Sequence, residues 1–194
     1  DADTLTGSDF GSGSRNDRES WVGEGGNDVI DGRGGWDTVQ YNLEEGASGV
    51  TVNLLTGTAT DTFGDTDTLF GIEAVRGTDL ADSLTGDGAG NFLDGREGND
   101  TIIGGGGDDT LRDGDGDDTI EGGDGRDRIE LGSGTDTVDG GAGEDTLITD
   151  FSQFTLPTGF IYQWDMTTGY HGQKGNTFNS DTISNVENLE VYGT

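Results

Sequence analysis

The sequence has no cysteine, one proline and one histidine among its 194 residues. Without cysteine, the chain can form neither a disulfide framework nor a metal site built on thiolates. Zinc prefers sulfur and nitrogen ligands, so it is a poor candidate for any metal site in this chain. No stretch approaches the ~18 consecutive apolar residues of a membrane-spanning helix, and we expect no membrane span.

Basic residues are also scarce. Nine Lys and Arg residues stand against 40 Asp and Glu residues, which gives a formal net charge of −31. A surface of this kind repels phosphate groups, which excludes nucleic acid and anionic membranes as partners. Cations are the natural counterpart of such a charge.

Apolar residues are too few for an ordinary core. They make up 28% of the sequence, whereas glycine alone contributes 39 residues. Each glycine costs extra backbone entropy when its conformation is fixed, and the net charge opposes compaction. On composition alone we expect the free chain to be unfolded or barely collapsed. Something besides apolar burial must hold a folded state together.

A nine-residue repeat dominates the sequence, with eight units from Gly77 to Ile148 that neither gain nor lose a residue. The sixth place of the units holds Asp82, Asn91, Asp100, Asp109, Asp118, Asp127, Asp136 and Asp145. The eighth place holds Leu84, Leu93, Ile102, Leu111, Ile120, Ile129, Val138 and Leu147. A disordered linker would not keep this phase, and frequent glycine without a 3.6-residue apolar period argues against helices. The period of nine instead predicts a solenoid.

The rest of the chain divides into three further segments. Residues 1–40 form a short first array with two units in register at 23–40, and Glu19 and Trp21 fill the acid and aliphatic places of a degenerate unit before them. Residues 41–76 and 149–194 interrupt the period, and 77–148 is the main array. The two interruptions resemble each other, with Glu73 and Glu187 in equivalent places, which hints at a shared structural contact. We interpret the chain as a piece of a longer protein.

Two units make one coil of eighteen residues. Glycine and aspartate favour tight turns in the first six places, and the last places form a short strand with one inward side chain. One sheet would then stack Leu84, Ile102, Ile120 and Val138, facing Leu93, Leu111, Ile129 and Leu147 in the other. Such a core is one side chain deep on each sheet, which is too little apolar area for independent stability.

Coiling also stacks acids that are eighteen residues apart, such as Asp109 and Asp127. Two carboxylates about 5 Å apart repel by roughly 3 kcal/mol at an effective dielectric constant of about 20. A hard dication between them reverses this effect. Ca²⁺ takes about six to eight oxygen ligands in flexible geometry, which two carboxylates and turn carbonyls can supply, whereas Mg²⁺ demands a stricter octahedron.

The units match G-G-x-G-x-D-x-U-x, where U is a large aliphatic residue, the pattern of the calcium-binding β-helix of RTX proteins. The chain therefore resembles the repeats-in-toxin (RTX) family of haemolysin-type calcium-binding repeats. This resemblance implies an all-β fold, a right-handed parallel β-roll (a β-solenoid) of nine-residue repeats with two non-repeat intervening or capping segments. It also implies Ca²⁺ as the cofactor, with several ions bound.

The family pattern implies a ligand set for each ion. One turn supplies the carbonyls of its second and fourth places and its Asp. The turn one coil later supplies the carbonyls of its first and third places and its Asp. The resemblance thus implies metal ligands at Asp28, Asp37, Asp82, Gly95, Gly98, Asp100, Gly104, Gly105, Gly106, Gly107, Asp109, Asp113, Gly114, Asp115, Gly116, Asp118, Gly122, Gly123, Asp124, Gly125, Asp127, Leu131, Ser133, Asp136, Gly140, Ala142 and Asp145.

Some positions depart from the pattern. Leu80 and Ala89 replace the fourth-place Gly and Asn91 replaces an Asp, which weakens the first two sites of the main array. In the first array we expect Asp37 to pair only with the degenerate turn of Asp17 and Glu19. We expect Asp28 to have no partner repeat one coil later.

Two other groups of residues allow more than one interpretation. We interpret Asp61, Asp65 and Asp67 as turn residues beside a strand, with an additional ion site as the alternative. Four neighbouring side chains are expected to cap an open end of the solenoid, with a carbohydrate-stacking surface as the alternative. They are Tyr162, Trp164, Tyr170 and His171. An EF-hand at 113–118 is rejected, because Asp118 stands where that loop needs Gly.

Catalytic motifs are absent from the sequence, which contains no HExxH, GxSxG, P-loop or cysteine nucleophile, and we do not expect an enzyme. The resemblance implies a calcium-binding module of a larger secreted bacterial protein, folding on Ca²⁺ after type I secretion, outside the cell or at its surface. Its partners would be calcium ions and other domains of the parent protein. Two alternatives stay open: an adhesin or carbohydrate- or surface-binding module with a glycan or surface ligand, and an accessory part of a secreted polysaccharide-active enzyme.

Overall fold

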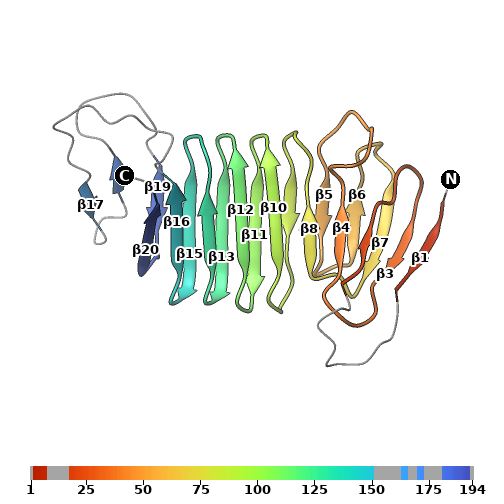
Figure 1. The fold of residues 1–194 in the computed structure, drawn as a ribbon, viewed down its shortest axis with the longest axis horizontal. Coiled ribbons are helices and arrows are strands. Elements are labelled where there is room, and N and C mark those ends of the chain that lie inside the picture. The colour runs from red at the N-terminus through yellow and green to blue at the C-terminus, as the bar shows by residue number, and fades with distance from the viewer. Residues whose placement is uncertain (1, 8–17, 151–162, 166–169, 173–180, 193–194) are drawn as a thin grey trace.

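A computed structural model describes residues 2–7, 18–150, 163–165, 170–172 and 181–192. The chain winds into an elongated stack of flat coils that pass alternately through two sheets (Figure 1). Strands are the regular elements of the described residues, and none of those residues forms a helix able to cross a membrane. The all-β prediction is therefore confirmed.

Sheet A has twelve strands. In spatial order they are β1 (Thr4–Thr6), β3 (Val29–Asp31), β7 (Thr66–Phe70), β6 (Thr58–Thr60), β5 (Thr51–Asn53), β9 (Ser83–Thr85), β11 (Thr101–Gly106), β13 (Thr119–Gly125), β15 (Thr137–Gly143), β19 (Thr182–Ser184), β18 (Tyr170–Gly172) and β17 (Gln163–Asp165).

Sheet B has eight strands. In spatial order they are β2 (Ser20–Trp21), β4 (Thr38–Gln40), β8 (Ala74–Arg76), β10 (Phe92–Glu97), β12 (Thr110–Asp115), β14 (Arg128–Leu131), β16 (Thr146–Asp150) and β20 (Asn188–Tyr192).

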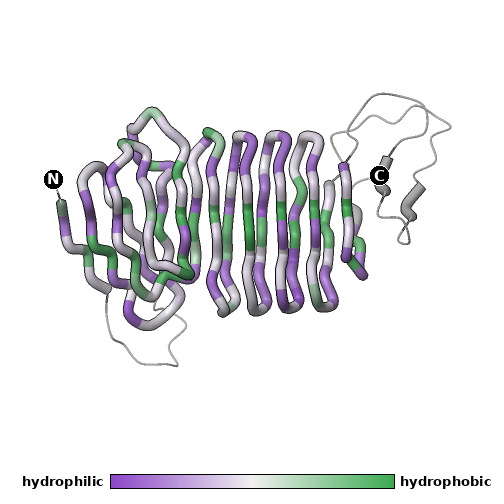
Figure 2. The backbone as a smooth tube through the Cα atoms, turned by 180° about the vertical axis from the view of Figure 1, so that it is seen from behind, coloured by the Kyte–Doolittle hydropathy of each residue, from purple (hydrophilic) through white to green (hydrophobic). Residues whose placement is uncertain are grey.

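Strand pairing in the arrays is parallel, with a register of eighteen residues. In sheet A, Ile120 pairs with Ile102 on one side and Val138 on the other. In sheet B, Leu111 and Ile129 pair in the same way. The eighth-place side chains are buried and form one continuous apolar core between the sheets. Figure 2 shows these apolar positions aligned from coil to coil. The predicted parallel β-roll is confirmed.

The intervening segments continue the roll. In the first of them, β7 pairs with β3 through Leu69 and Ile30, and β8 pairs with β4 through Val75 and Val39. The antiparallel pairs β5–β6 and β6–β7 extend sheet A between the two arrays. In the second segment, β19 and β20 pair with β15 and β16. Each intervening segment therefore adds strands to both sheets of the roll.

The degenerate first units also join the stack, Trp21 with the register of eighteen residues and Leu5 across 25 residues. Leu5 pairs with Ile30, and Trp21 pairs with Val39, so an aromatic residue occupies an aliphatic place of the stack. In the second segment the backbones of Trp164 and His171 pair in the β17–β18 hairpin. The four aromatic and imidazole side chains expected to form a cap lie outside the described part of the chain.

Candidate metal centres

The acids of the sixth place form two hydrogen-bonded ladders along the roll. The backbone amide of Asp100 donates to Oδ1 of Asp118 at 2.7 Å, and that of Asp109 donates to Oδ1 of Asp127 at 2.9 Å. Asp82, Asn91, Asp118 and Asp127 make the same bond to the acid eighteen residues later. One oxygen of each stacked carboxylate is thereby fixed by the backbone of the coil before it.

The second oxygen of most array carboxylates is buried without a partner. Among the described residues, Oδ2 accepts no hydrogen bond in Asp100, Asp109, Asp118, Asp127 and Asp145. Burial removes water from these groups, which raises the pKa of Asp100 and Asp109 to about 7. Buried charged oxygens are costly unless an opposite charge or a donor meets them. These atoms are therefore the strongest candidates for cation ligands.

First-place glycines leave a small oxygen-lined space beside these carboxylates. A Cβ on Gly104 would stand 2.4 Å from Oδ2 of Asp109 and 2.4 Å from the carbonyl oxygen of Gly122, one coil later. A Cβ on Gly122 would likewise meet Oδ2 of Asp127 at 2.6 Å and the carbonyl oxygen of Gly140 at 2.3 Å. Each such space joins a free carboxylate oxygen to a main-chain carbonyl. The donors are all hard oxygens, the ligands that Ca²⁺ takes.

The other glycines of the expected ligand set shape the turns. A left-handed backbone occurs at Gly105, with φ of +102°, and at Gly107, with φ of +100°. Gly98, Gly114, Gly116, Gly123 and Gly125 also have positive φ. Gly106 lies between two such residues, at the end of β11. This conformation is open to glycine at little steric cost.

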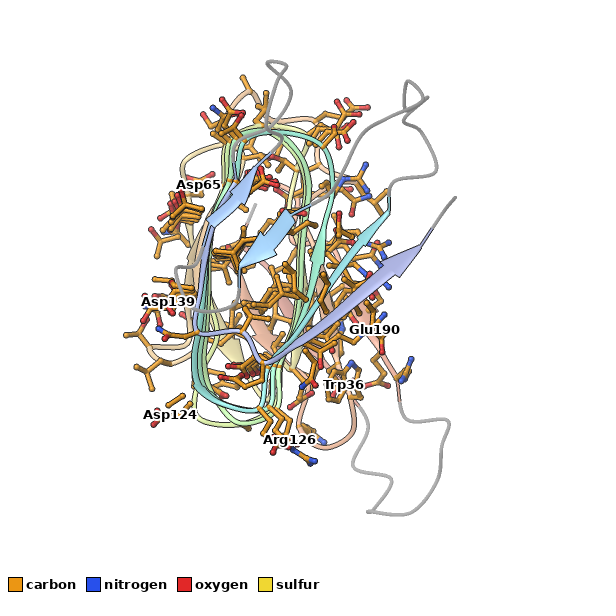
Figure 3. All side chains as sticks on the ribbon, turned by 90° about the vertical axis from the view of Figure 1, so that its left-hand side faces the viewer. Trp36, Asp65, Asp124, Arg126, Asp139 and Glu190 are labelled. Atoms are coloured by element: carbon orange, nitrogen blue, oxygen red, sulfur yellow. The ribbon has the colours of Figure 1, made fainter. Side chains whose placement is uncertain are left out.

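The side chains of four other expected ligands point elsewhere. Leu131 is buried in the apolar core, so only its main chain remains for a metal. Ser133 donates through Oγ to Oδ1 of Asp115 at 2.6 Å on the surface. Asp124 and Ala142 are exposed in the turns that end β13 and β15. Figure 3, which looks along the roll, shows Asp124 and Arg126 at the same edge.

The two turns that depart from the repeat pattern satisfy their sixth-place residues internally. Both oxygens of Asp82 accept hydrogen bonds: Oδ1 from the amide of Val50 at 2.7 Å, and Oδ2 from the amide of Thr78 at 2.6 Å. Oδ1 of Asn91 accepts the amide of Asp87 at 2.8 Å. Because these oxygens already accept hydrogen bonds, a bound cation would stabilise them less than the unpartnered oxygens further along the array.

Two expectations for the first array are wrong. The amide of Asp28 donates to Oδ1 of Asp67 at 3.0 Å, so Asp67 supplies the acid one coil later across 39 residues. The amide of Asp37 donates to Oε2 of Glu73 at 2.8 Å, so its partners are not limited to the degenerate turn. Glu19 does contact it, because its amide donates to Oδ1 of Asp37 at 3.0 Å. The intervening segment therefore extends these ladders.

The second intervening segment extends the ladders in the same way, at the end of the main array. The amide of Asp136 donates to Oδ1 of Asp181 at 3.0 Å, and that of Asp145 donates to Oε2 of Glu187 at 2.8 Å. Glu73 and Glu187 thus make equivalent contacts, as their equivalent places in the sequence suggested. Sequence reasoning named Asp67 only in an alternative ion site with Asp61 and Asp65, and it did not name Glu73, Asp181 or Glu187 as site residues. The signal was present in the paired runs of Asp, Thr and an aliphatic residue, with Glu six residues after each Asp.

Asp61 and Asp65 act as turn residues. Oδ1 of Asp61 accepts the amides of Phe63 at 2.9 Å and Asp65 at 2.8 Å, and Oδ2 of Asp65 accepts the amide of Gly26 at 3.0 Å. This agrees with their interpretation as turn residues. Asp67 differs from them because it occupies a ladder position.

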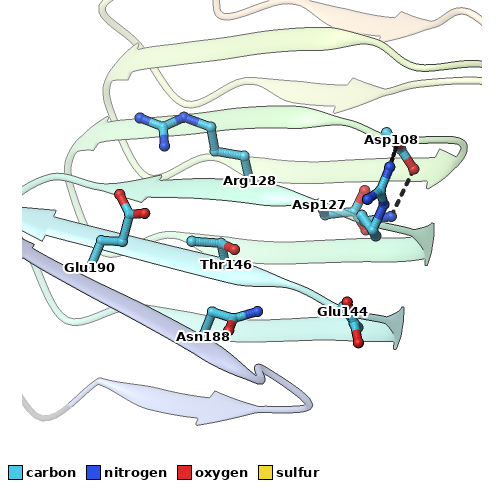
Figure 4. Close-up of a pocket in the computed structure, with 8 residues that line it drawn as sticks. Asp108, Asp127, Arg128, Glu144, Thr146, Asn188 and Glu190 are labelled. Atoms are coloured by element: carbon cyan, nitrogen blue, oxygen red, sulfur yellow. Dashed lines mark hydrogen bonds and ion pairs between the residues drawn. The ribbon is translucent and has the colours of Figure 1, made fainter.

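A groove on the outer face of sheet B, with a volume of about 420 Å³, is lined by residues of β14, β16 and β20 and by the ladder acid Asp127. Figure 4 shows its lining, in which Arg126 pairs with Asp108 at 3.1 Å. Nearby, Arg128 pairs with Glu130 at 2.7 Å. The groove presents paired surface charges, and the buried free oxygens belong to the turns instead.

The family comparison agrees with this geometry. The RTX calcium-binding nonapeptide repeat, a family whose repeats bind Ca²⁺ and are structural rather than catalytic, matches residues 22–42, 76–111 and 113–147 in four copies. No curated protein matches the chain. The matched residues contain the two in-register units at 23–40, nearly all of the main array and the sixth-place acids of these units. The repeats of this chain therefore belong to the RTX calcium-binding nonapeptide repeat family, and they fold as a parallel β-roll.

Proposed function

We propose that this chain is a calcium-dependent folding module of a larger secreted bacterial protein. The observation that carries the proposal is the row of buried Oδ2 atoms of Asp100, Asp109, Asp118, Asp127 and Asp145, which accept no hydrogen bond among the described residues. Stacked carboxylates oppose closure of the roll. Bound Ca²⁺ would supply the positive charge that offsets this repulsion.

The ligands follow from the stacking. We propose that Asp109 and Asp127 share one ion, with the carbonyls of Gly105, Gly107, Gly122 and Asp124. Asp127 and Asp145 share the next, with the carbonyls of Gly123, Gly125, Gly140 and Ala142. In the first array, Asp28 and Asp67 form an equivalent pair, since Oδ2 of each is buried without a hydrogen-bond donor in the described structure.

The segments have distinct tasks in this proposal. Residues 77–148 form the main ion-binding array, and residues 1–40 form a shorter one. Residues 41–76 and 149–194 complete or cap the ladders of the array that precedes each of them. The module itself is not an enzyme, and its partners are calcium ions and the other domains of the parent protein.

The physical setting favours folding after export. Extracellular calcium modules bind with dissociation constants of about 10⁻⁴–10⁻³ M, so such sites fill outside a cell and stay empty inside it. An unfolded acidic chain suits passage through a type I secretion channel, and calcium outside the cell would then drive folding. Coupled sites in a one-dimensional stack give a steep transition, because each coil contacts only its neighbours.

Circular dichroism with calorimetry tests the proposal. Chelator-treated protein should lack the β-sheet signal, calcium should restore it cooperatively, and magnesium should be much less effective. Identical spectra with and without calcium would contradict a calcium-dependent fold. Calorimetry on the same samples counts the ions bound.

A second function has one structural observation in its favour. Thr101, Thr119 and Thr137 pair in register across sheet A, and all three side chains are exposed. This regular hydroxyl row suits an adhesin or a carbohydrate- or surface-binding module. Binding of calcium-loaded protein to a glycan array or to ice, lost when Thr119 is changed to Lys, would support it. If calcium-loaded protein binds neither glycans nor ice, this second function is contradicted and only the structural role is supported.

A further inference from the structure

One unit of the main array carries an acid where most others have glycine. Asp113 occupies the first place of the unit 113–121, whereas the units around it begin with Gly95, Gly104 and Gly122. Strand β12 turns both Leu111 and Asp113 inward, and Asp113 is only 1% exposed. This turn therefore carries a buried carboxylate in its first place in addition to its sixth-place acid, Asp118.

The first place faces the free carboxylate oxygen of its own unit. A Cβ added at Gly95 would stand 2.3 Å from Oδ2 of Asp100, and one added at Gly104 would stand 2.4 Å from Oδ2 of Asp109. At residue 113 the chain places a real side chain in this position. That side chain is another acid, so it adds a carboxyl group beside the first one instead of donating a hydrogen bond to it.

Backbone donors hold the Asp113 carboxylate in place. Its Oδ1 accepts the amide of Gly114 at 2.6 Å and the amide of Gly132 at 2.7 Å. Its Oδ2 is buried and accepts no hydrogen bond from the described residues. The β12–β14 ladder ends at the pair of Arg112 and Glu130, the amide of Gly132 then bonds to this carboxylate, and pairing between the two coils resumes at Asp115 and Ser133.

Three carboxylates converge at this turn. One oxygen from each of Asp113, Asp118 and Asp136 lies within 4.8 Å of the others, and all three residues are buried. Oxygens that share a Ca²⁺ at about 2.3–2.6 Å are at most about 5 Å apart, so one ion can contact all three. The backbone amide of Asp100 holds Oδ1 of Asp118, whose Oδ2 is buried without a hydrogen bond to the described chain.

We propose that Asp113, Asp118 and Asp136 form a three-carboxylate calcium site that binds more tightly than the two-carboxylate sites of the array and fills first. The side chain of Asp113, rather than its carbonyl alone, is the distinguishing ligand. This inference rests on the proposed function, because it concerns one site of the same roll. Affinity in oxygen-ligand sites rises with the number of charged ligands. The filled site would nucleate the roll near the middle of the main array.

Calorimetric calcium titration of the full chain tests the proposal with three variants. Asp113→Gly restores the common residue, Asp113→Asn keeps the shape but removes the charge, and Glu121→Gln removes a charge from the same unit at an exposed position outside the ligand set. We expect both Asp113 variants to lose the tightest binding step, with at least a tenfold weaker first association constant. Glu121→Gln should retain that step.

Circular dichroism at saturating calcium shows whether each variant still forms the roll. An unchanged or tighter first step in folded Asp113→Gly or Asp113→Asn would overturn the three-carboxylate site and leave the proposed function intact. An equal loss in Glu121→Gln would also overturn it, because the effect would then be one of net charge. Absence of any calcium uptake by the unaltered chain would overturn the proposed function as well.

Discussion

Glu187 accepts, through Oε2, a hydrogen bond of 2.8 Å from the backbone amide of Asp145, which lies 42 residues earlier in the chain. Glu73 makes the same contact with Asp37, also at 2.8 Å. Each Glu follows the preceding ladder acid by six residues instead of nine. The side chain of Glu is longer than that of Asp, so its carboxylate reaches the ladder although the turn before it is shorter than in a regular unit.

This relationship predicts that the length of the Glu187 side chain affects the stability of the calcium-loaded roll. Glu187→Asp removes one methylene, so the carboxylate no longer reaches the amide of Asp145. A hydrogen bond to a charged group contributes about 1.5–3 kcal/mol, and we expect the free energy of unfolding in saturating calcium to fall by that order. Glu187→Gln keeps the acceptor and should lose less. Urea unfolding measures both, and equal losses would contradict a role for side-chain length.

Substitution of array acids should depend on position. Asp118 stands between Asp100 and Asp136 in its ladder and has a buried free oxygen, whereas both oxygens of Asp82 are already hydrogen-bonded. We therefore expect Asp118→Ala to raise the calcium midpoint of folding more than Asp82→Ala, by roughly tenfold for each ~1.4 kcal/mol lost. Calcium titrations followed by circular dichroism give both midpoints. If Asp118→Ala raises the calcium midpoint no more than Asp82→Ala does, the proposed difference between these two turns is contradicted.

The pH dependence follows from the raised pKa values. Burial raises the pKa of Asp100, Asp109 and Asp136 to about 7, well above the ordinary value of such a carboxyl. The folded calcium-free roll therefore binds more protons than the unfolded chain between roughly pH 4 and pH 7. Its stability is greatest below the unfolded pKa and is lost as pH rises through the folded pKa.

Metal-free protein should accordingly gain β-sheet signal when the pH falls from 8 to 5. The calcium midpoint should rise over the same range, because protons and calcium compete for the same oxygens. Circular dichroism of metal-stripped protein at several pH values measures the first trend, and calcium titration at each pH measures the second. A calcium-free chain that becomes more ordered at higher pH would contradict this account.

Two glycines of the main array should respond differently to alanine. Gly105 has φ of +102°, and a Cβ there would stand 2.4 Å from the carbonyl oxygen of Asp87. Backbone strain of this kind costs about 1–3 kcal/mol, so Gly105→Ala should lower the calcium-saturated unfolding free energy by at least that amount. Gly88 has no neighbour within 4 Å of its would-be Cβ, and Gly88→Ala should be nearly neutral. Thermal unfolding of the two variants compares them, and similar losses would refute the turn geometry.

Much of the roll could be predicted from the repeat. Side chains alternate across a strand, so an aliphatic residue at the eighth place of each nine-residue unit specifies one buried row per sheet. A period of nine with two sheets requires a register of eighteen, and the pairing of Ile102 with Ile120 obeys it. The stacking of Asp109 on Asp127 follows from the same count, and their amide and carboxylate do meet.

The sequence alone thus determined the sheets, the register and the acid ladders of the main array, because all of these follow from one local period. Only the tertiary structure decided how the ladders close, since Asp28 meets Asp67 and Asp136 meets Asp181 across intervals of 39 and 45 residues. Such intervals follow no period, and the path of the intervening chain sets which residues stack. The structure also decided the role of Asp113, because two backbone amides and an inward strand face, rather than its residue type, direct its carboxylate into the turn.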